Sequence, residues 1–301
     1  MTIMVIGSAN TDLIIQVEHL PRPGETLLGG KFLTASGGKG ANQAVAAARL
    51  GGKVCFIASI GQDSFGEALL KKYAQDSINI QHIKRPQSAS GIAMVCVASN
   101  GQNSIVVAPG SNAFLTPCDI AAIEDQFLHA KVVLTQLEIP LSTIVAAAKL
   151  AYKHKCLFIL NPAPAYVLPD ELYPFIDIIT PNEIEAELLT GIRVCDLSSA
   201  LTASKILHQR GIKNVIITMG HQGAFFYDGK NEVLVPTLQV NAIDTTAAGD
   251  TFNGALAKTL CNSNDIISAI KYANKASALS VTKLGAQSSI PYPHEIEALQ
   301  G

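Results

Sequence analysis

The sequence lacks the patterns that mark several common classes of protein. Its six cysteines stand singly, without any C-x-x-C pair, which is typical of buried free thiols in a reducing cytosol. Its seven histidines show no metal-ligand spacing. There is also no G-x-S-x-G sequence and no G-x-x-x-x-G-K-[ST] phosphate loop. We therefore set aside the chemistries that depend on these motifs.

Strong charge and long apolar runs are also missing. The net charge is −2, the pI is about 6.4, and no five like charges stand in a row, so nothing indicates binding to nucleic acid or an anionic membrane. No stretch approaches the roughly 18 apolar residues of a membrane span. The apolar run 3–6 is cut short by Asn10 and Asp12 and has no basic region before it, unlike a signal peptide. We expect a cytoplasmic protein with small polar partners.

The alternation of apolar segments predicts an α/β fold. A length of 301 residues allows one large domain, and we expect a single domain over 1–301. Residues 3–7 form a continuous apolar run, as in a strand buried on both faces. From residue 54 onward strands and helices alternate, which favours a mostly parallel central sheet with helices on both faces. The expected strands are 54–60, 132–137, 157–160, 176–180 and 215–218, and the expected helices include 65–75, 141–154 and 266–283.

Two segments interrupt this alternation and predict a small β-sheet. Residues 13–17 and 26–34 alternate between apolar and polar positions around a Pro-Arg-Pro-Gly turn. Residues 91–98 and 104–107 flank Asn100-Gly101, a strong hairpin signal. We expect a four-stranded lid built from about 13–34 and 91–107.

The stretch 244–254 carries the most informative chemistry. A strand-like segment, 240–243, precedes it, and small residues lead through Gly249 into a helix that includes Ala255. Amides in the first turn of a helix have no internal partner and attract anions. Asp250 lies in that turn, where its carboxylate could cap the helix or accept a proton from a reacting group.

A second glycine-rich stretch, 36–43, leads into an expected helix at 44–50. Gln43 stands where a dinucleotide-binding fingerprint needs its third glycine, and no acidic residue follows about twenty positions later. A Rossmann cofactor site is therefore not expected. Lys39 and Asn42 offer hydrogen-bonding groups to ligand hydroxyls, although a glycine-rich turn with a solvated lysine also fits.

Polar side chains follow the ends of two expected strands. Asn10 and Asp12 come after the first strand, and Glu138 comes after strand 132–137. Ligands of open α/β sheets bind at the carboxyl ends of the strands. Asn and Asp are also ordinary turn residues, so both interpretations of Asn10 and Asp12 stay open.

Two further stretches present polar groups beside the sheet. Asn182 and Glu185 have the spacing of a capping box, and the alternative is a polar pair over a magnesium-bound phosphate. Thr218, Gly220 and Gly223 place a hydroxyl and glycines at the end of strand 215–218.

Several of these motifs, in this order, resemble the ribokinase-type carbohydrate kinase family over essentially the whole chain. The residues that carry the resemblance are 10–12, 37–42, 161–165, 181–185, 218–223 and 244–250. The commonest family signature has Gly-Ala-Gly-Asp at its catalytic loop, and this chain has Ala247 at the first of those positions. The resemblance implies an ATP:sugar phosphotransferase with an α/β core and a β-sheet lid that also forms a homodimer interface.

The resemblance also implies a role for each motif. Asp250 would be the catalytic base, and the amides of the helix start would bind the transferring phosphoryl group beside ATP-bound Mg²⁺. The helix-start residues are Ala247, Ala248, Gly249 and Asp250. The sugar would contact Asn10, Asp12, Gly38, Lys39, Asn42, Glu138 and Asp250. ATP would contact Asn182, Glu185, Thr218, Gly220, Gly223, Gly249 and Asn274.

A monovalent cation is the last implication of the resemblance. K⁺ would be bound by Asp244 and by oxygens of two loops. The implied ligands are Asp244, Thr246, Ser280, Lys283, Gly285 and Ser289. The alternative is that Asp244 only accepts hydrogen bonds from the amides of the turn that follows it.

The predicted reaction is the ATP-dependent phosphorylation of D-ribose at its primary 5-hydroxyl. Alternatives within the class are kinases of 2-deoxyribose, fructose or a nucleoside. A sugar-binding protein without chemistry shares the polar crevice and the lid, but it has no use for Asp250 among free amides.

Overall fold

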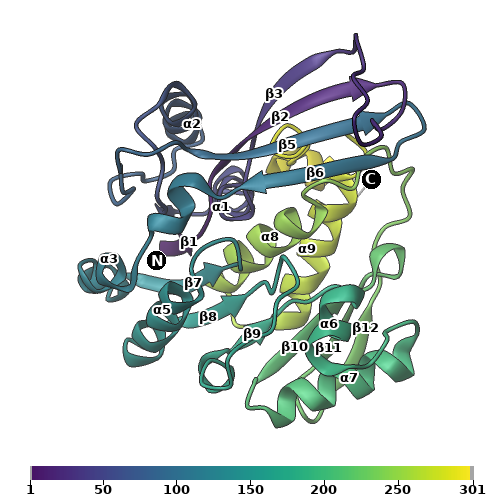
Figure 1. Ribbon diagram of the computed structural model, residues 1–301. Coiled ribbons are helices and arrows are strands. Elements are labelled where there is room, and N and C mark those ends of the chain that lie inside the picture. Colours follow the sequence, from purple (N-terminus) through teal and green to yellow (C-terminus); the bar gives the residue numbers. More distant parts are fainter. Residues whose placement is uncertain (1, 299–301) are drawn as a thin grey trace.

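The computed structural model describes residues 2–298, which form two sheets with helices around the larger one (Figure 1). The larger sheet has the order β12-β11-β10-β9-β8-β7-β1-β4. Six neighbouring strands of this sheet are parallel, namely β4, β1, β7, β8, β9 and β10. Strands β11 and β12 are antiparallel additions at one edge. The strands are β1 (Thr2–Ile6), β4 (Val54–Ile57), β7 (Ala130–Thr135), β8 (Leu157–Leu160), β9 (Ile178–Ile179), β10 (Asn214–Thr218), β11 (Ala224–Tyr227) and β12 (Glu232–Val235).

Helices cover both faces of this sheet, as the sequence predicts. Successive strand residues point to opposite faces, so Ile3 and Val5 join one core while Met4 and Ile6 join the other. The first core is closed by α1 (Lys39–Arg49), α2 (Ser64–Gln75), α8 (Ala248–Asn262), α9 (Ile266–Ser280) and α10 (Pro293–Glu297). The second is closed by α3 (Pro117–Ala121), α4 (Glu124–Phe127), α5 (Leu141–Lys153), α6 (Glu183–Thr190) and α7 (Leu197–Gln209).

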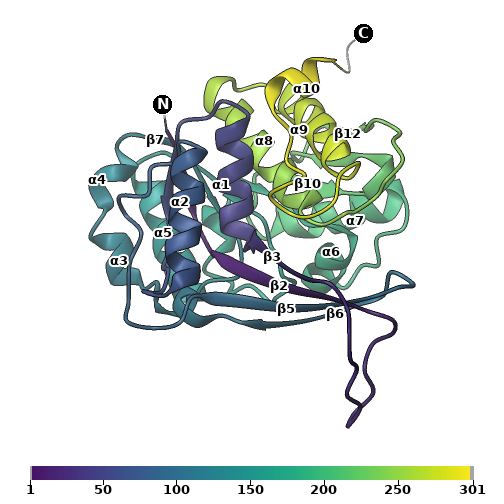
Figure 2. The same ribbon diagram turned by 90° about the horizontal axis from the view of Figure 1, so that it is seen from above.

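The smaller sheet has the order β3-β2-β5-β6 and combines the two segments that interrupt the α/β alternation. Strand β2 (Asn10–Val17) pairs in parallel with β5 (Gly91–Ala98) along eight residues, and the outer pairs are antiparallel. The outer strands are β3 (Phe32–Gly37) and β6 (Asn103–Ala108). The chain between β2 and β3 projects from the body of the molecule (Figure 2).

Three local predictions are wrong. Residues 26–31 are not a strand, because Gly29 and Gly30 have φ of 95° and 110°, outside the β region. Residues 240–243 are not a strand either, since the backbone amide of Ile243 donates to the carbonyl of Val281 beyond α9 instead of to a neighbouring strand. The thiols are only partly buried, because Cys118 and Cys195 are exposed.

Helix α1 begins at Lys39, five residues before the predicted start at 44. Gly38 precedes it with φ of 88°, and the amides of Gly40 and Ala41 donate to the side chain and backbone of Ser8. The helix start is therefore stabilised by contacts from β1's end, which no local pattern reveals. In the part of the chain that the structure describes, no helix is both long and apolar enough to cross a membrane.

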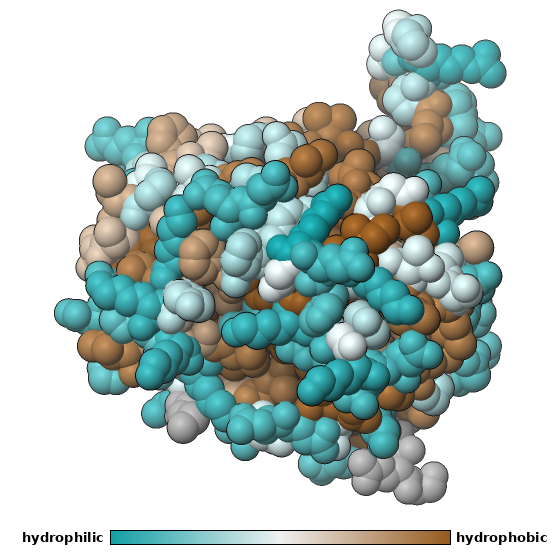
Figure 3. Space-filling view, turned by 90° about the horizontal axis from the view of Figure 1, so that it is seen from below, coloured by the Kyte–Doolittle hydropathy of each residue, from teal (hydrophilic) through white to brown (hydrophobic). Residues whose placement is uncertain are grey.

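The lower face of the molecule is mostly hydrophilic. Figure 3 shows hydrophilic side chains over much of that face, with apolar side chains in separate patches between them.

Candidate active site

Helix α8 begins with backbone amides beside open space. Ala247, immediately before it, has φ of 60°, and among residues 2–298 no side chain caps the helix. A Cβ added to Gly249 would meet no described atom within 4 Å. Uncapped first-turn amides carry partial positive charge and attract anions. This helix start can therefore receive a phosphoryl group.

The carboxylate of Asp250 is buried in that first turn and is held by α1. Its Oδ2 accepts from Asn42 Nδ2 at 2.9 Å, and its Oδ1 accepts from Gln43 Nε2 at 3.0 Å. The two helices approach closely, since a Cβ on Gly254 would lie 2.5 Å from Ala46 Cβ. These bonds run to another helix and not to the amides of α8, so Asp250 does not act as the cap of its own helix.

Lys39 is a partly buried cation among three carboxylates. Burial lowers the pKa of Lys39, but the negative charges of Asp250, Glu138 and Glu185 outweigh it and raise that pKa. Lys39 is therefore protonated at neutral pH. The four side chains come from α1, α6, α8 and the end of β7, so the charges meet only in the folded protein.

Glu138 caps the start of α1. Its Oε2 accepts from the amide of Lys39 at 2.9 Å and from the hydroxyl of Ser8. The Ser8 hydroxyl in turn accepts from the amide of Gly40 at 3.2 Å. A carboxylate at a helix N-terminus is favoured by the helix dipole. Ser8 was not among the sequence candidates, because a serine after a strand carries no distinctive signal.

Asn10 lies at the start of β2 with its orientation set by a buried neighbour. Asn112 Nδ2 donates to Asn10 Oδ1 at 2.7 Å, and Asn112 Oδ1 accepts from the amide of Ala9 at 2.9 Å. Asn10 can therefore offer its amide nitrogen to a ligand. A cavity of about 460 Å³ is lined by residues that include Asn10, Asn112 and Glu138. The role of Asn112 could not be found from sequence, because it lies 102 residues from Asn10.

Asp12 is a partly buried carboxyl group next to glycines. Burial, and to a smaller extent the charge of Glu138, raises the pKa of Asp12 to about 6. A Cβ on Gly37 would lie 2.3 Å from Asp12 Oδ2, and one on Gly38 would lie 2.7 Å from the amide nitrogen of Asn10. Gly37 is thus needed for the close approach of β3 to β2, and Gly38 for the close approach of the turn before α1 to the start of β2.

Asn182 and Glu185 form the capping box at the start of α6. Asn182 Oδ1 accepts from the Glu185 amide at 2.8 Å, and Glu185 Oε2 accepts from the Asn182 amide at 2.9 Å. Burial raises the pKa of Glu185, which is 7% exposed. The capping interpretation therefore holds. It leaves one Glu185 oxygen for other contacts.

The residues predicted to contact ATP lie around β10 and α9. An isolated bridge joins Asn182 to Thr218 at the end of β10. The short helix after it contains Gly220, with φ of 50°, and a Cβ on Gly223 would lie 2.2 Å from the carbonyl oxygen of Val235. Asn274 is buried, and its Nδ2 donates to that same carbonyl at 2.8 Å. Asn274 thus supports the end of β12.

Asp244 joins the loop before α8 to the loop after α9. Its Oδ1 accepts from the amide of Thr246 at 2.9 Å, and its Oδ2 accepts from the amide of Gly285 at 2.8 Å. Burial opposes ionisation, but these bonds and the Thr246 hydroxyl lower the pKa of Asp244. The turn alternative is therefore present in the structure, together with a bond to the second loop.

The other implied cation ligands surround these loops. The hydroxyls of Ser280 and Ser289 donate to the carbonyls of Ser277 and Ala286, and Lys283 Nζ pairs with Glu295. In the range 2–298, no three His, Cys, Asp or Glu side chains could hold a metal ion together. A cation here would need carbonyl oxygens in addition to Asp244, which is the donor set that suits K⁺.

Uncapped helix amides, a buried carboxylate and a partly buried lysine meet beyond the ends of β1 and β7, and this arrangement suits phosphoryl transfer. The chain belongs to the pfkB family of carbohydrate kinases, whose pattern it matches over residues 1–293. It is 47% identical to the ribokinase of Haemophilus influenzae over 295 residues, which are 98% of this chain and 96% of that protein.

The chain is also similar to a kinase of another sugar and to a solved ribokinase structure. It is 40% identical to the deoxyribokinase of Salmonella typhi over 293 residues, 97% of this chain and 96% of that protein. The structure of Arabidopsis thaliana ribokinase complexed with ribose and ATP has a TM-score of 0.93 and 30% identity, over 99% of this chain and 98% of that one.

Proposed function

We propose that the chain transfers the terminal phosphoryl group of ATP to the 5-hydroxyl of D-ribose. Relatives named ribokinase, up to 47% identical over nearly the full chain, support ribose as the sugar. The observation that carries the proposal is the Asp250 carboxylate, buried and oriented by Asn42 and Gln43 at the uncapped start of α8.

Asp250 acts as the general base in this proposal. It takes the proton of the sugar hydroxyl as that oxygen attacks the phosphorus. The amides of 247–250 stabilise the negative charge on the transferring group, as oriented donors at a helix start do. The αL conformation of Ala247 and the open space at Gly249 fit this role.

The sugar binds between the small sheet and α1. Asn10 offers an amide nitrogen and Asp12 a carboxyl group to the ring hydroxyls. Gly38, Lys39, Asn42 and Glu138 complete the proposed contacts. Lys39 also carries the positive charge that offsets the surrounding carboxylates. A site that pairs each hydroxyl discriminates strongly against a sugar that lacks one.

ATP binds along the ends of β10 and α6. Thr218, Gly220, Gly223 and Asn274 form or support the surface for the nucleotide, and Asn182, Glu185 and Gly249 lie on the phosphate side. Mg²⁺ prefers one or two carboxylates together with substrate phosphates, and the free oxygen of Glu185 fits that preference. When bound, Mg²⁺ neutralises charge on the phosphate oxygens.

K⁺ is proposed between the loops that Asp244 joins. One carboxylate and the carbonyl oxygens of both loops would hold it, with Thr246, Ser280, Lys283, Gly285 and Ser289 as the further ligands. The bond from the Gly285 amide to Asp244 supports the idea, because it brings the two loops together.

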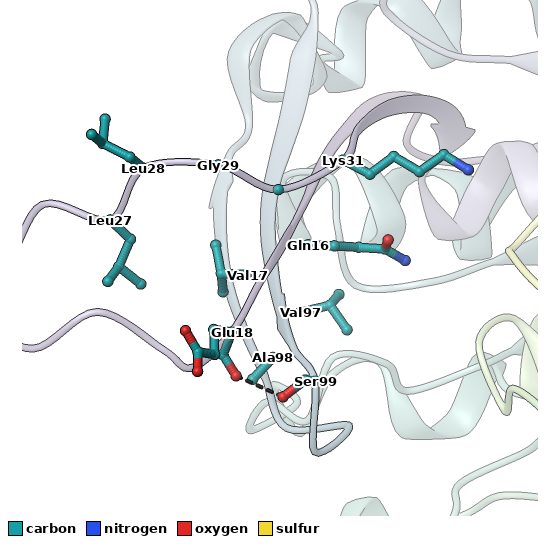
Figure 4. A pocket seen from close by; sticks show the side chains of 11 residues that line it. Gln16, Val17, Glu18, Leu27, Leu28, Gly29, Lys31, Val97, Ala98 and Ser99 are labelled. Carbon is teal, nitrogen blue, oxygen red and sulfur yellow. Dashed lines mark hydrogen bonds between the residues drawn. The ribbon is translucent and has the colours of Figure 1, made fainter.

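The small sheet is proposed as a lid that excludes water and as a homodimer interface. Its exposed apolar side chains support an interface, because a solvated sheet seldom exposes so many. They include Phe32, Met94, Ile105, Val106 and Val107. At the end of β2 away from Asn10, a cavity of about 560 Å³ lies between residues 27–31 and Val97 to Ser99 (Figure 4). Leu28, one of the residues that line this cavity, is 96% exposed (Figure 4). We treat 1–301 as one catalytic domain that carries this lid, and we assign it to the cytoplasm.

Kinetics with four substrates test the proposal. We expect ADP release that depends on D-ribose, with a higher kcat/KM for ribose than for 2-deoxyribose, fructose or a nucleoside. The relative named deoxyribokinase makes 2-deoxyribose the decisive competitor. Equal or higher kcat/KM for 2-deoxyribose would move the chain to that specificity. The absence of sugar-dependent ADP release would leave only a sugar-binding protein.

A further inference from the structure

A fully buried amide, that of Gln43, holds Asp250 from the interior of the protein. Gln43 lies in α1 next to Asn42 and has 0% exposure. Its Nε2 is 3.0 Å from Asp250 Oδ1 and 3.0 Å from Asn161 Oδ1, and its Oε1 accepts from Gln136 Nε2 at 2.6 Å. Both hydrogens of the Gln43 amide therefore have acceptors and its oxygen has a donor. This side chain has no hydrogen on Nε2 left for a substrate.

Its neighbours fix which way the Gln43 amide points. Asn161 Nδ2 donates to the carbonyl of Thr180 at 3.1 Å, so Asn161 must present its oxygen to Gln43. A reversed Gln43 amide would set its oxygen against two acceptor oxygens and its NH₂ group against the NH₂ group of Gln136. Unpaired buried polar groups are costly, so only one orientation is stable.

Asn42 makes the matching bond to the other carboxylate oxygen but differs in two ways. It is 6% exposed, and its Nδ2, which donates to Asp250 Oδ2, has a second hydrogen that can reach a ligand. Asn42 Oδ1 accepts from Gln287 at 3.2 Å. The two oxygens of Asp250 are therefore unlike: Oδ1 is held by a fully buried amide, and Oδ2 is held by Asn42, one of the proposed sugar contacts.

We propose that Gln43 is a positioning residue that keeps Oδ1 occupied, so that Oδ2 is the oxygen that accepts the proton. This rests on the proposed function, in which Asp250 is the base. In the step, the O–H bond of the sugar hydroxyl breaks and its proton passes to Oδ2. The hydroxyl oxygen bonds to the phosphorus, and the bond from phosphorus to the bridging oxygen breaks, with its electron pair leaving on ADP. The Gln43 bond stops the carboxylate from turning about its Cβ–Cγ bond during this transfer.

The variant Gln43→Glu tests the inference. It keeps the side chain's size but places an acceptor, and a second carboxyl group, against Oδ1. We expect kcat to fall on the order of 10- to 100-fold, as a small misplacement of a reacting group does, with a much smaller change in the KM for ribose. Two carboxyl groups that share a site raise the pKa of one, so the acid limb of the kcat–pH profile should move to higher pH.

Gln136→Met is the matched control. It removes the donor to Gln43 Oε1 and disturbs the same core, but it leaves the bond from Gln43 to Asp250 in place. We expect a lower melting temperature with most of kcat kept and an unshifted pH profile. If Gln43→Glu shows only the changes of Gln136→Met, Gln43 is a structural core residue and the inference is wrong.

A measurement on the unaltered protein covers the case in which the variants do not fold. We expect the side-chain NH₂ of Gln43 to exchange slowly with solvent, by NMR, both with and without ribose. Loss of this protection on adding ribose would overturn the inference. Ribose-dependent ADP release by the wild type and its loss in Asp250→Asn test the proposed function separately. If the wild type releases no ribose-dependent ADP, or if Asp250→Asn keeps its activity, both the proposed function and the role of Gln43 are wrong. If only Gln43→Glu has normal kinetics, the proposed function stands and the role of Gln43 is wrong.

Discussion

Asp250 is the residue on which the proposed chemistry depends, and its replacement gives the most direct prediction. Asp250→Asn keeps the shape of the side chain but cannot take a proton. We expect kcat to fall on the order of 10²- to 10⁴-fold, with ribose binding largely kept in a calorimetric titration. Near-normal turnover would mean that the buried carboxylate has only a structural role.

Asp196 provides the control for that variant. Its side chain caps the exposed start of α7, and Asn caps helices as well as Asp does. Asp196→Asn should therefore leave both kcat and ribose binding at wild-type values.

Asp12 gives a prediction about pH and stability. Its pKa is about 6 in the folded protein and 3.8 ordinarily, so between these values the folded state binds more protons than the unfolded state. The stability of the ribose-free protein should then fall, through Asp12, as the pH rises from about 4 to 6. Asp12→Asn removes this penalty, so its melting temperature relative to wild type should increase between pH 4 and pH 8. A constant difference across that range would contradict the raised pKa.

At the residue scale, the sequence predicted the candidate site residues better than the residues that hydrogen-bond to them. Asp250, Asn42 and Lys39 were singled out from glycine-rich and small-residue stretches, and the structure brings them together. Asn112 and Gln43 were not recognised as partners, because the bond from Gln43 to Asp250 joins residues 207 positions apart. A buried amide among apolar residues has no periodic signal. Only the tertiary fold assigns its contacts.

At the scale of elements, Asp244 joins the loop before α8 to the loop after α9. If K⁺ binds between them, it should raise activity without touching the substrate, and Na⁺ should do less because it fits a carbonyl cage poorly. The measurement is the rate in Tris buffer with potassium chloride, sodium chloride or neither, at matched ionic strength. Indistinguishable rates would leave Asp244 as a turn residue that accepts from Thr246 and Gly285.

Elements with a periodic core pattern were predicted well, and those defined by distant contacts were not. Strand β8 and helix α5 were expected within one residue of their observed bounds. Strands β11 and β12 and helix α7 were not predicted. Short strands lack clear start signals, whereas Asp196 is an ordinary N-cap residue that could have indicated the start of α7. The segment 240–243 has strand-like composition, but its backbone pairs with Val281 at the end of a helix, which composition cannot show.

At the scale of the whole molecule, the exposed apolar face of the lid predicts a dimer. Met94 and Val106 are 61% and 66% exposed on adjacent strands β5 and β6. We expect wild type to sediment as a dimer in analytical ultracentrifugation. The double variant with Met94→Lys and Val106→Lys should sediment as a monomer, because two charges would then lie in the apolar face. Leu128→Lys, at a similarly exposed site after α4, is the control and should stay dimeric. A monomeric wild type would contradict the proposed dimer interface.

The parallel pairing of β2 with β5 also bears on how the molecule folds. Eight residue pairs join segments about 80 positions apart in the sequence. The Asp250 carboxylate accepts hydrogen bonds from Asn42 and Gln43, which are more than 200 positions away. Such distant contacts form late, because the entropy of closing long loops is lost before they can stabilise anything. During refolding from denaturant, far-UV circular dichroism should therefore recover before phosphotransfer does, and no isolated half of the chain contains a complete catalytic centre.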